Sequence, residues 1–485
     1  MIQIYNSLTG RKDNLQPIRA GEVSLYLCGD TVYDFCHVGH ARSKVAFDVV
    51  RRHLIHRGFR VTFVRNITDI DDKIIRRSAE LGESMKDFTD RFIRAMHEDY
   101  DQLNILRPDH EPRATEHVAG MITLSKTLID KGFAYVASNG DVMYSVSSFQ
   151  GYGKLSGKRL ADLRAGSRID IDTSKHDPLD FVLWKMVKLG EPSWDSPWGP
   201  GRPGWHIECS VMSAAILGAH FDIHAGGMDL KFPHHENEIA QSCAATGKRF
   251  ANVWMHNGFL NIDDEKMSKS LGNFFTIRDL LSSGHLKHPE VLRHFLISSH
   301  YRGPINYSLT QLDQADASLT RLYTALRGLN SVPTMAISVA NETEFSDKIF
   351  GQSAHWEHFN AVMDDDFNTP EAIAAMQAVA SDINRSKDAG DIKQAEVLAE
   401  ILYGMGAVLG VLNMPAEHWF KLSKSSGVAS ALGWSDEYIE DAIMARKAAR
   451  VAKQFKRSDE IRDQLLGAGI VLEDKPGGVT HWRRL

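Results

Sequence analysis

Two histidines around a glycine form the first candidate site for chemistry. His37, Gly39 and His40 lie in the fragment DFCHVGHARS (residues 34–43), just before a stretch of helical periodicity. The glycine lets a ligand approach the backbone, and the N–H groups of a helix N-terminus attract anions. The histidines could then donate hydrogen bonds to phosphate oxygens whose charge grows during a displacement reaction. Cys36 beside them leaves a metal site open as a second interpretation.

A lysine-rich segment is the second candidate. In KMSKS (residues 266–270), Lys266 and Lys269 accompany the hydroxyl groups of Ser268 and Ser270. Two ammonium groups suit a pyrophosphate leaving group, because each is a compact charge with rotatable donors. Taken alone, each of the two segments is also typical of a solvated polar loop.

Four further residues have the side chains of a zinc site. They are two cysteines, a histidine and a glutamate: Cys28, Cys209, His234 and Glu238. Two thiolates, an imidazole and a carboxylate are a plausible zinc set, although no local CxxC pair accompanies them. His234 and Glu238 are four residues apart, so on a helix they would share a face. Each cysteine alone is equally consistent with a small buried hydrophobic residue, which is the role expected of Cys243.

The elements that must position these residues follow an α/β pattern. Runs of β-forming residues predict strands at 22–28, 60–68 and 221–227, and a further apolar run covers 253–262. Between the first two strands, the helical periodicity ends at Gly58. Strand, loop, helix and strand make a βαβ unit, and ligands bind at the carboxyl ends of such strands.

Other segments depart from this pattern. Residues from about 106 to 203 carry helix and strand signals of their own and are interpreted as an insertion. The pattern from about 308 to 412 is helical, interrupted by a polar linker at 331–348, and a mixed unit covers about 426 to 485. Three consecutive aspartates, residues 364–366, precede a Thr-Pro-Glu helix start and are expected to lie at a solvated helix N-terminus rather than in a cation site.

Composition excludes several classes of protein. A chain of 485 residues with 43% hydrophobic and 24% charged residues predicts two to four globular domains. Four cysteines are too few for a disulfide scaffold, and neither a signal peptide nor a membrane-spanning run is visible. We therefore expect a cytoplasmic protein that does not bind membranes. The net charge is −6, but residues 441–485 hold ten Lys/Arg against six Asp/Glu, so a polyanion would be bound locally.

The order of the two phosphate motifs gives the first resemblance. HVGH followed about 230 residues later by KMSKS resembles the two signatures of class I aminoacyl-tRNA synthetases. The resemblance implies a Rossmann-type domain in which both motifs bind ATP and stabilise the transition state of adenylate formation. Its catalytic residues would be His37, His40, Lys266 and Lys269. The ATP-binding residues would be His37, Gly39, His40, Lys266, Ser268 and Lys269.

Longer segments make the resemblance specific. YLCGDTVYDFCHVGHAR, GWHIECS, GGMDLKFPHHENEIAQS, HNGFLNIDDEKMSKSLGN and the end GIVLEDKPGGVTHWRR resemble the cysteinyl-tRNA synthetase family. The resemblance covers essentially the whole chain and implies one Zn²⁺ per chain, with the ligands Cys28, Cys209, His234 and Glu238. A soft thiolate binds zinc well and a serine hydroxyl poorly, so zinc would select cysteine without an editing domain.

The resemblance also implies binding residues for the amino acid and the tRNA. The amino-acid pocket would include Gly29, Thr68, Trp205 and Asp229. The anticodon would be bound by Arg450, Phe455, Asp459 and Asp474, residue types that read splayed bases by hydrogen bonding and stacking. Phe455 stands where the family commonly has tryptophan, so a hydrogen bond through an indole N–H is lost. A surface amphipathic helix explains the stretch DAIMARKAARVAKQFKRSDEIRDQLL (residues 441–466) almost as well.

The implied architecture is an α/β class I catalytic domain followed by two smaller units. The catalytic domain would span 1–307, with its connective insertion at about 106–203 and a stem-contact region containing KMSKS at about 253–307. A helical-bundle tRNA-binding domain would span 308–425, and a mixed anticodon-binding unit 426–485. The expected reaction is ATP-dependent ligation of L-cysteine to tRNA-Cys through cysteinyl-adenylate. Mg²⁺ is expected with ATP, and the chain is expected to be a monomer.

Two alternatives remain open from the sequence. A related ligase couples cysteine to a glucosaminyl-inositol in mycothiol synthesis, but it lacks an anticodon unit, so the chain beyond residue 308 argues against it. A zinc-stabilised RNA-binding paralogue without catalysis is the other alternative. The intact HVGH and KMSKS motifs argue against that second class.

Overall fold

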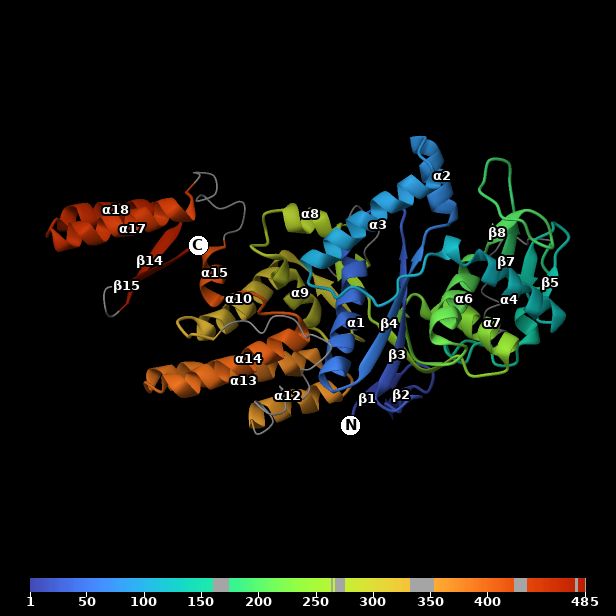
Figure 1. Cartoon of the computed structure of the whole chain (residues 1–485), viewed down its shortest axis with the longest axis horizontal. Helices are drawn as coiled ribbons and strands as arrows, with labels where there is room; N and C mark the ends of the chain where they lie inside the picture. Colours follow the sequence, from blue (N-terminus) through green and yellow to red (C-terminus); the bar gives the residue numbers. More distant parts are fainter. Residues whose placement is uncertain are drawn as a thin grey trace.

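The computed structural model describes most of the chain as an elongated molecule. Its described residues are 1–159, 174–262, 265–266, 275–331, 353–422, 434–475 and 479–484. An α/β body with an inserted subdomain forms one end, and a pair of helices with a two-stranded sheet forms the other (Figure 1). Among the helices of these ranges, none is long and apolar enough to cross a bilayer.

A parallel sheet forms the centre of the body. Its strands, in the spatial order β10-β9-β3-β4, are β3 Glu22–Thr31, β4 Arg60–Thr68, β9 Phe221–Gly227 and β10 Ala251–Asn257. The predicted strands 60–68 and 221–227 have these bounds. The predicted strand 22–28 continues three residues further, beyond a register shift between Leu27 and Asp30. The apolar run 253–262 is divided at Gly258, where the chain passes so close to Gly303 that a Cβ would lie 2.3 Å from the Gly303 carbonyl oxygen.

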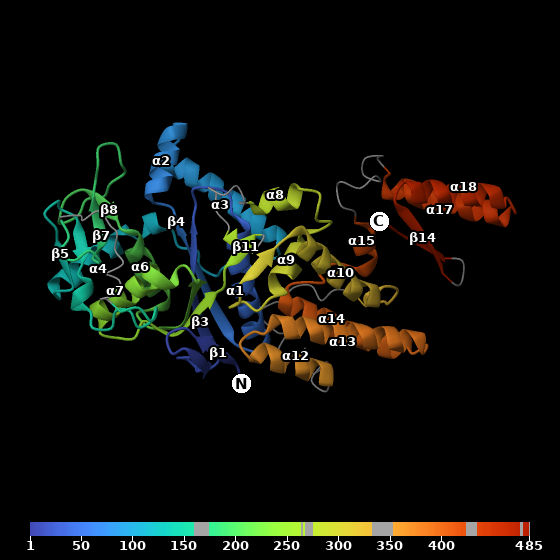
Figure 2. The ribbon, with the colours of Figure 1, turned by 180° about the vertical axis from the view of Figure 1, so that it is seen from behind.

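The first helix crosses from β3 to β4. Helix α1, Val38–His56, has 15 buried residues because the sheet covers one side and the helices α9 (Pro289–Ile297) and α14 (Ile392–Leu409) cover the other. Figures 1 and 2 show it between these layers. Its buried charged groups have partners: Arg52 Nε lies 2.7 Å from Asp48 Oδ2, and Arg42 Nη2 donates to the His300 carbonyl oxygen at 2.7 Å. Such pairing is required of charged groups in a low-dielectric interior.

The predicted insertion is a subdomain with its own antiparallel sheet. The sheet order is β5-β6-β7-β8, with β5 Ala134–Val136, β6 Val142–Tyr144, β7 Phe181–Met186 and β8 Gly201–Pro203. It packs with helix α4 Val118–Asp130, and with α6 Trp205–Leu217, which leads the chain back to β9. Helix α7, Glu236–Thr246, then connects β9 to β10.

Smaller elements complete the body. The strands are β1 Gln3–Asn6, β2 Arg11–Asn14, β11 Leu260–Ile262, β12 Glu265–Lys266 and β13 Ile305–Tyr307. The helices are α2 Asp72–Leu81, α3 Met85–Gln102 and α8 Ile277–Ser282, and the short helical turns are η1 Ala114–Glu116, η2 Val146–Ser148 and η3 Lys231–His235.

Two helical units follow. The bundle contains α10 Leu309–Leu326, α12 Ala354–Asp364, α13 Thr369–Asp388, α14 and α15 Ala416–Lys421. The terminal unit contains α17 Asp436–Val451, α18 Phe455–Gly467, β14 Ile470–Lys475 and β15 Val479–Arg484 around a separate small core. The single amphipathic helix considered from the sequence is thus two helices, separated at Lys453, whose φ is 57°.

The expectation for the acidic triplet is wrong in one respect. Helix α13 does begin at Thr369, but Asp366 is fully buried rather than solvated. Its carboxylate accepts hydrogen bonds from Tyr301 Oη (2.7 Å) and Tyr5 N (2.9 Å), and Arg302 Nε lies 2.6 Å away. The triplet therefore joins the bundle to the body, a tertiary role that local helix signals do not reveal. The same pairing argues against a cation at this position.

Candidate functional site: a buried cluster of two thiols, an imidazole and a carboxylate

Four side chains from four elements meet beside the carboxyl end of β3. Cys28 lies in β3, Cys209 in α6, His234 in η3 and Glu238 in the first turn of α7. All four are buried, and their donor atoms lie within 4.8 Å of one another. The sequence predicted these residues, but it expected His234 and Glu238 on one regular helix. Instead, the irregular turn η3 carries His234 immediately before α7 begins.

The distances among the four donor atoms suit a tetrahedral zinc ion. Cys28 Sγ lies 3.7 Å from Cys209 Sγ and 3.6 Å from Glu238 Oε1, and His234 Nε2 lies 3.1 Å from Glu238 Oε1. Zinc bonds of about 2.3 Å to sulfur and about 2.0–2.2 Å to nitrogen or oxygen place tetrahedral ligand atoms roughly 3.3–3.8 Å apart. The residues present therefore fit the ion in type and number, and both distances from Cys28 Sγ fall within this range, while the distance between His234 and Glu238 is slightly shorter.

Without a cation the thiols are held in their neutral form. Burial, followed by the hydrogen bond with Cys209, raises the pKa of Cys28 well above its ordinary range. A thiolate is the form that binds zinc, so metal binding must release protons from this site.

The imidazole of His234 is oriented by its neighbours. Its ring stacks on Trp205 with centroids 4.2 Å apart, and its Nδ1 lies 3.0 Å from His206 Nδ1. Burial lowers the pKa of His234 well below its ordinary range and that of His206 to about 4, so both rings are neutral. With Nδ1 engaged by His206, Nε2 is directed at Glu238, as expected of a metal-ligating histidine.

Three histidines near this cluster were given no role in the interpretation of the sequence. His235 Nε2 lies 3.3 Å from Cys28 Sγ, and its Nδ1 lies 2.8 Å from His256 Nε2. His224 Nε2 lies 2.8 Å from Glu238 Oε2. Together with Cys28 and Glu238, His224 and His235 make a second, overlapping group of potential ligands. These three histidines lie on three separate elements, so their spacing in the sequence did not indicate that they pack together.

The predicted phosphate motif lies at the N-terminus of α1. His37 is the N-cap residue, and its ring stacks on that of His40 with centroids 3.6 Å apart. His40 Nε2 lies 4.0 Å from Asp30 Oδ1. Cys36 is separate from these rings in its contacts: it is buried with Sγ 3.3 Å from Tyr100 Oη. In the described ranges it joins no group of potential metal ligands, which argues against the metal interpretation of this loop.

The second phosphate motif is only partly within the described residues. Lys266 ends β12, whose backbone pairs with β11 at Asn261. Ser268 and Lys269 lie outside the described residues.

Of the residues predicted for the amino-acid pocket, Gly29 and Trp205 adjoin the cluster. Thr68 Oγ1 donates to Glu208 Oε2 at 2.8 Å, and Trp205 is 42% exposed over His234. Gly29 follows Cys28, and Asp229 is exposed in the loop after β9. Asn66, which the sequence did not single out, contacts Gly29: its Oδ1 accepts from Gly29 N at 2.8 Å. No local pattern marks such a contact, since it depends on the register of two strands.

The predicted anticodon residues divide into two groups in the terminal unit. Arg450 Nη1 donates to Asp474 Oδ2 at 3.0 Å, and Arg446 makes two hydrogen bonds of 2.8 Å to the same carboxylate. The Arg446 bonds hold the pKa of Asp474 well below its usual range. On α18, Phe455 is 63% exposed, and Asp459 lies 3.4 Å from Arg462.

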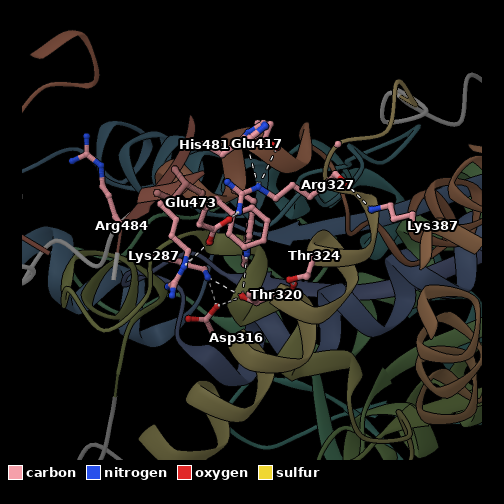
Figure 3. A pocket seen from close by; sticks show the side chains of 15 residues that line it. Lys287, Asp316, Thr320, Thr324, Arg327, Lys387, Glu417, Glu473, His481 and Arg484 are labelled. Carbon is pink, nitrogen blue, oxygen red and sulfur yellow. Dashed lines mark hydrogen bonds and ion pairs between the residues drawn. The ribbon is translucent and has the colours of Figure 1, made fainter. Parts of the chain in front are cut away.

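A cleft of about 520 Å³ separates the bundle from the terminal unit (Figure 3). Its basic side chains are already paired: Arg327 bonds Glu417 (3.1 Å) and Glu473 (2.7 Å), and Lys287 lies 2.7 Å from Asp316. Because its charges satisfy one another, the cleft has the character of an interface between units rather than of a reaction site.

Comparison with known proteins gives concordant results for every part of the chain. Family models match at residues 14–317 (tRNA synthetases class I (C) catalytic domain), 358–413 (DALR domain) and 436–483 (cysteinyl-tRNA ligase anticodon binding domain). Proteins named cysteine–tRNA ligase from Methylococcus capsulatus and Halorhodospira halophila are 56% and 57% identical over 484 and 485 residues, covering 100% of both chains. A methionyl-tRNA synthetase structure from Mycobacterium tuberculosis, in complex with methionyl-adenylate, shares the fold, with TM-score 0.55, 16% identity and coverage of 84% and 92%.

Proposed function

The chain belongs to the cysteine–tRNA ligase family, and from that premise we propose that it joins L-cysteine to tRNA-Cys through a cysteinyl-adenylate. ATP supplies the adenylyl group and pyrophosphate leaves. The observation that carries the choice of amino acid is the buried set of Cys28, Cys209, His234 and Glu238, whose spacing suits zinc. The match of the terminal unit to an anticodon-binding domain supports tRNA over a small sugar acceptor.

In this proposal Cys28, Cys209, His234 and Glu238 hold one Zn²⁺. The bound ion supplies affinity for a soft thiolate that a serine hydroxyl does not match. Trp205, stacked on His234, closes one side of the pocket. Gly29, Thr68 and Asp229 complete the amino-acid site. The chain's own residues thus orient the substrate carboxylate toward the N-terminus of α1.

The activation step belongs to the two phosphate motifs. His37, Gly39 and His40 bind the phosphates at the N-terminus of α1, where backbone N–H groups and imidazoles stabilise the charge that develops on the α-phosphate. The lysines Lys266 and Lys269, with Ser268, bind the departing pyrophosphate, and Mg²⁺ accompanies ATP. The carboxylate oxygen of cysteine attacks the α-phosphorus, and the bond to the β-phosphate oxygen breaks.

Transfer requires the remaining units. We assign 1–307 to the catalytic domain, including the connective insertion at about 106–203 and the stem-contact region at about 253–307. Residues 308–425 form the helical bundle and 426–485 the anticodon-binding unit, with Arg450, Phe455, Asp459 and Asp474 as the contacts to the anticodon. The enzyme acts as a monomer in the cytoplasm. In the second step the 3′-terminal adenosine hydroxyl takes the cysteinyl group, and AMP leaves.

Cysteine-dependent exchange of pyrophosphate into ATP tests the activation step without tRNA. We expect robust exchange with cysteine and a loss of at least about 100-fold in Lys269→Ala, comparable to removal of one electrostatic contact to a developing charge. Unchanged exchange in this variant would contradict the role of the lysine motif. Absence of exchange in the wild-type protein would favour the non-catalytic RNA-binding alternative.

A further inference from the structure

The ladder between β3 and β4 is interrupted beside the first cysteine of the cluster. The two strands pair in register from Glu22 to Leu27, and pairing resumes only at Asp30. Cys28 and Gly29 therefore fall where the regular strand-to-strand hydrogen bonds are missing. Buried backbone groups at such a break need other partners.

Two side chains supply these partners. The N–H of Gly29 donates to Asn66 Oδ1 at 2.8 Å, and the carbonyl oxygen of Cys28 accepts from Lys44 Nζ at 3.3 Å. These two backbone groups belong to one peptide group, so that peptide is held at its nitrogen and at its oxygen by different elements. Asn66 and Lys44 are 2% and 4% exposed; the Lys44 contact is buried and the Asn66 contact is partly buried.

Asn66 also contacts the second cysteine of the cluster. Its Oδ1 lies 3.7 Å from Cys209 Sγ, and its Nδ2 lies 3.5 Å from Thr68 Oγ1. Because the Gly29 N–H needs an acceptor, the side-chain amide of Asn66 is oriented with its oxygen toward Gly29. The uncharged side chain of Asn66 thereby contacts both Gly29, which follows Cys28, and the sulfur of Cys209.

The close packing of the strands prevents this peptide from relaxing. A Cβ on Gly29 would lie 1.5 Å from the Asn66 carbonyl oxygen, so the two backbones are in direct contact. Lys44 is fixed as well, since its ammonium lies 2.9 Å from Asp30 Oδ1. Asp30 in turn accepts from Tyr100 Oη at 2.7 Å.

We propose that Asn66 and Lys44 are positioning residues that clamp the Cys28–Gly29 peptide and so direct the Cys28 thiol toward the zinc position. The inference rests on the proposed zinc site and deepens it. Because Lys44 lies one turn after His40 on α1, the clamp also joins the metal site to the helix that carries the phosphate motif. Both residues act through the Cys28–Gly29 peptide.

Zinc affinity of the full-length protein, measured by competition with a chromogenic chelator, tests the clamp. Asn66→Leu keeps the size of the side chain but removes the acceptor, and we expect its zinc Kd to rise about 10- to 100-fold, the range found when partners that orient metal ligands are lost. Asn66→Asp keeps an acceptor for Gly29 N, and its Kd should stay within about threefold of wild type on the same reasoning. A wild-type Kd in Asn66→Leu would overturn the proposal.

A matched control separates positioning from general stability. Asn360 in α12 is also buried, and its Oδ1 lies 2.8 Å from His56 Nε2, far along the chain from the cluster. Asn360→Leu should lower the melting temperature without changing zinc Kd; an equal loss of zinc affinity in both variants would overturn the specific role of Asn66. Failure of the wild-type protein to bind zinc would instead contradict the proposed function.

If Asn66→Leu does not fold, the double variant Asp30→Asn/Lys44→Met tests the second contact of the clamp, the one from Lys44 to the Cys28 carbonyl oxygen. Removing both charges leaves no unpaired buried ion, while the Cys28 carbonyl loses its donor. The same rise in zinc Kd in a folded double variant supports the clamp. An unchanged Kd would overturn it.

Discussion

At the residue scale, the candidate zinc site depends on the donor atoms that two cysteines, a histidine and a glutamate direct to one point. Two of these side chains are held by their neighbours: His234 by Trp205 and His206, and Glu238 by His224. The sequence predicted the ligand set through the family resemblance. It could not predict the neighbours, because their contacts join residues from separate elements.

Replacing one thiol tests the selectivity of the site. Cys209→Ser substitutes a hard, protonated hydroxyl for a soft ligand, so we expect zinc content per chain to fall well below one. Discrimination between cysteine and serine should fall with it, toward the roughly 10- to 200-fold that packing alone provides. Metal analysis and paired exchange assays measure both. Retention of zinc and of discrimination would exclude Cys209 as a ligand.

At the element scale, the carboxyl ends of β3 and β9 and the N-terminus of α1 place the proposed zinc and phosphate sites side by side. Strands β4 and β9 were predictable from their runs of β-forming residues, and their bounds match the prediction. The interruption in β3 was not predictable, since it depends on how Gly29 packs against Asn66. The role of Asp366 was likewise hidden, because Arg302 and Tyr301 lie more than sixty residues away in the sequence.

Replacing Gly29 with alanine adds a methyl group where the pairing of β3 with β4 is interrupted, and so tests how closely these strands pack. In Gly29→Ala the Cβ would lie 1.5 Å from the Asn66 carbonyl oxygen, an overlap that backbone movement must relieve. We expect a loss of about 3 kcal/mol or more in unfolding free energy, at or above the usual range for overpacking. Gly467→Ala is the control, since nothing lies within 4 Å of its Cβ position; urea unfolding should show it unchanged or slightly more stable. Equal stability of both variants would contradict the close contact.

The buried carboxyl group of Glu290 in helix α9 makes the stability of the fold depend on pH. Burial raises the pKa of Glu290 to about 7, although Leu412 N donates to it at 2.6 Å. Because the pKa of Glu290 is higher in the folded state than in the unfolded state, this group stabilises the fold. Its contribution to the free energy of unfolding is fully present below about pH 4.5 and is lost as pH rises toward 7. Glu290→Gln should therefore gain stability relative to wild type across this window. Urea unfolding at pH 4.5 and 7.5 measures the difference; a constant difference would contradict the assignment.

At the scale of the whole molecule, the body and the terminal unit must hold a fixed separation for one tRNA to reach both. Arg327, at the end of α10 in the bundle, connects the bundle to the terminal unit by bonding Glu473, and it also bonds Glu417 within the bundle (Figure 3). Family resemblance predicted the order of the units from the sequence. The ion pairs that connect them were not predictable, because exposed charges give no signal of their partners.

Loss of this connection should separate the two half-reactions. Arg327→Ala is expected to lower kcat/KM for tRNA about tenfold, equivalent to about 1.4 kcal/mol, while cysteine-dependent pyrophosphate exchange stays unchanged. Arg385→Ala is the matched control, because its exposed side chain pairs only with Asp382 of the same helix among the described ion pairs. Equal effects on exchange and on aminoacylation would contradict a role confined to tRNA.

The most direct test of the central claim is aminoacylation of tRNA-Cys with cysteine and with serine, before and after removal of zinc by a chelator. We expect the zinc-loaded enzyme to charge cysteine and to reject serine by a factor well above the roughly 200-fold limit of packing. Chelation should abolish charging with cysteine, and added Zn²⁺ should restore it. Full activity and unchanged discrimination in a verified zinc-free enzyme would contradict the claim that the buried cluster selects the substrate through its metal.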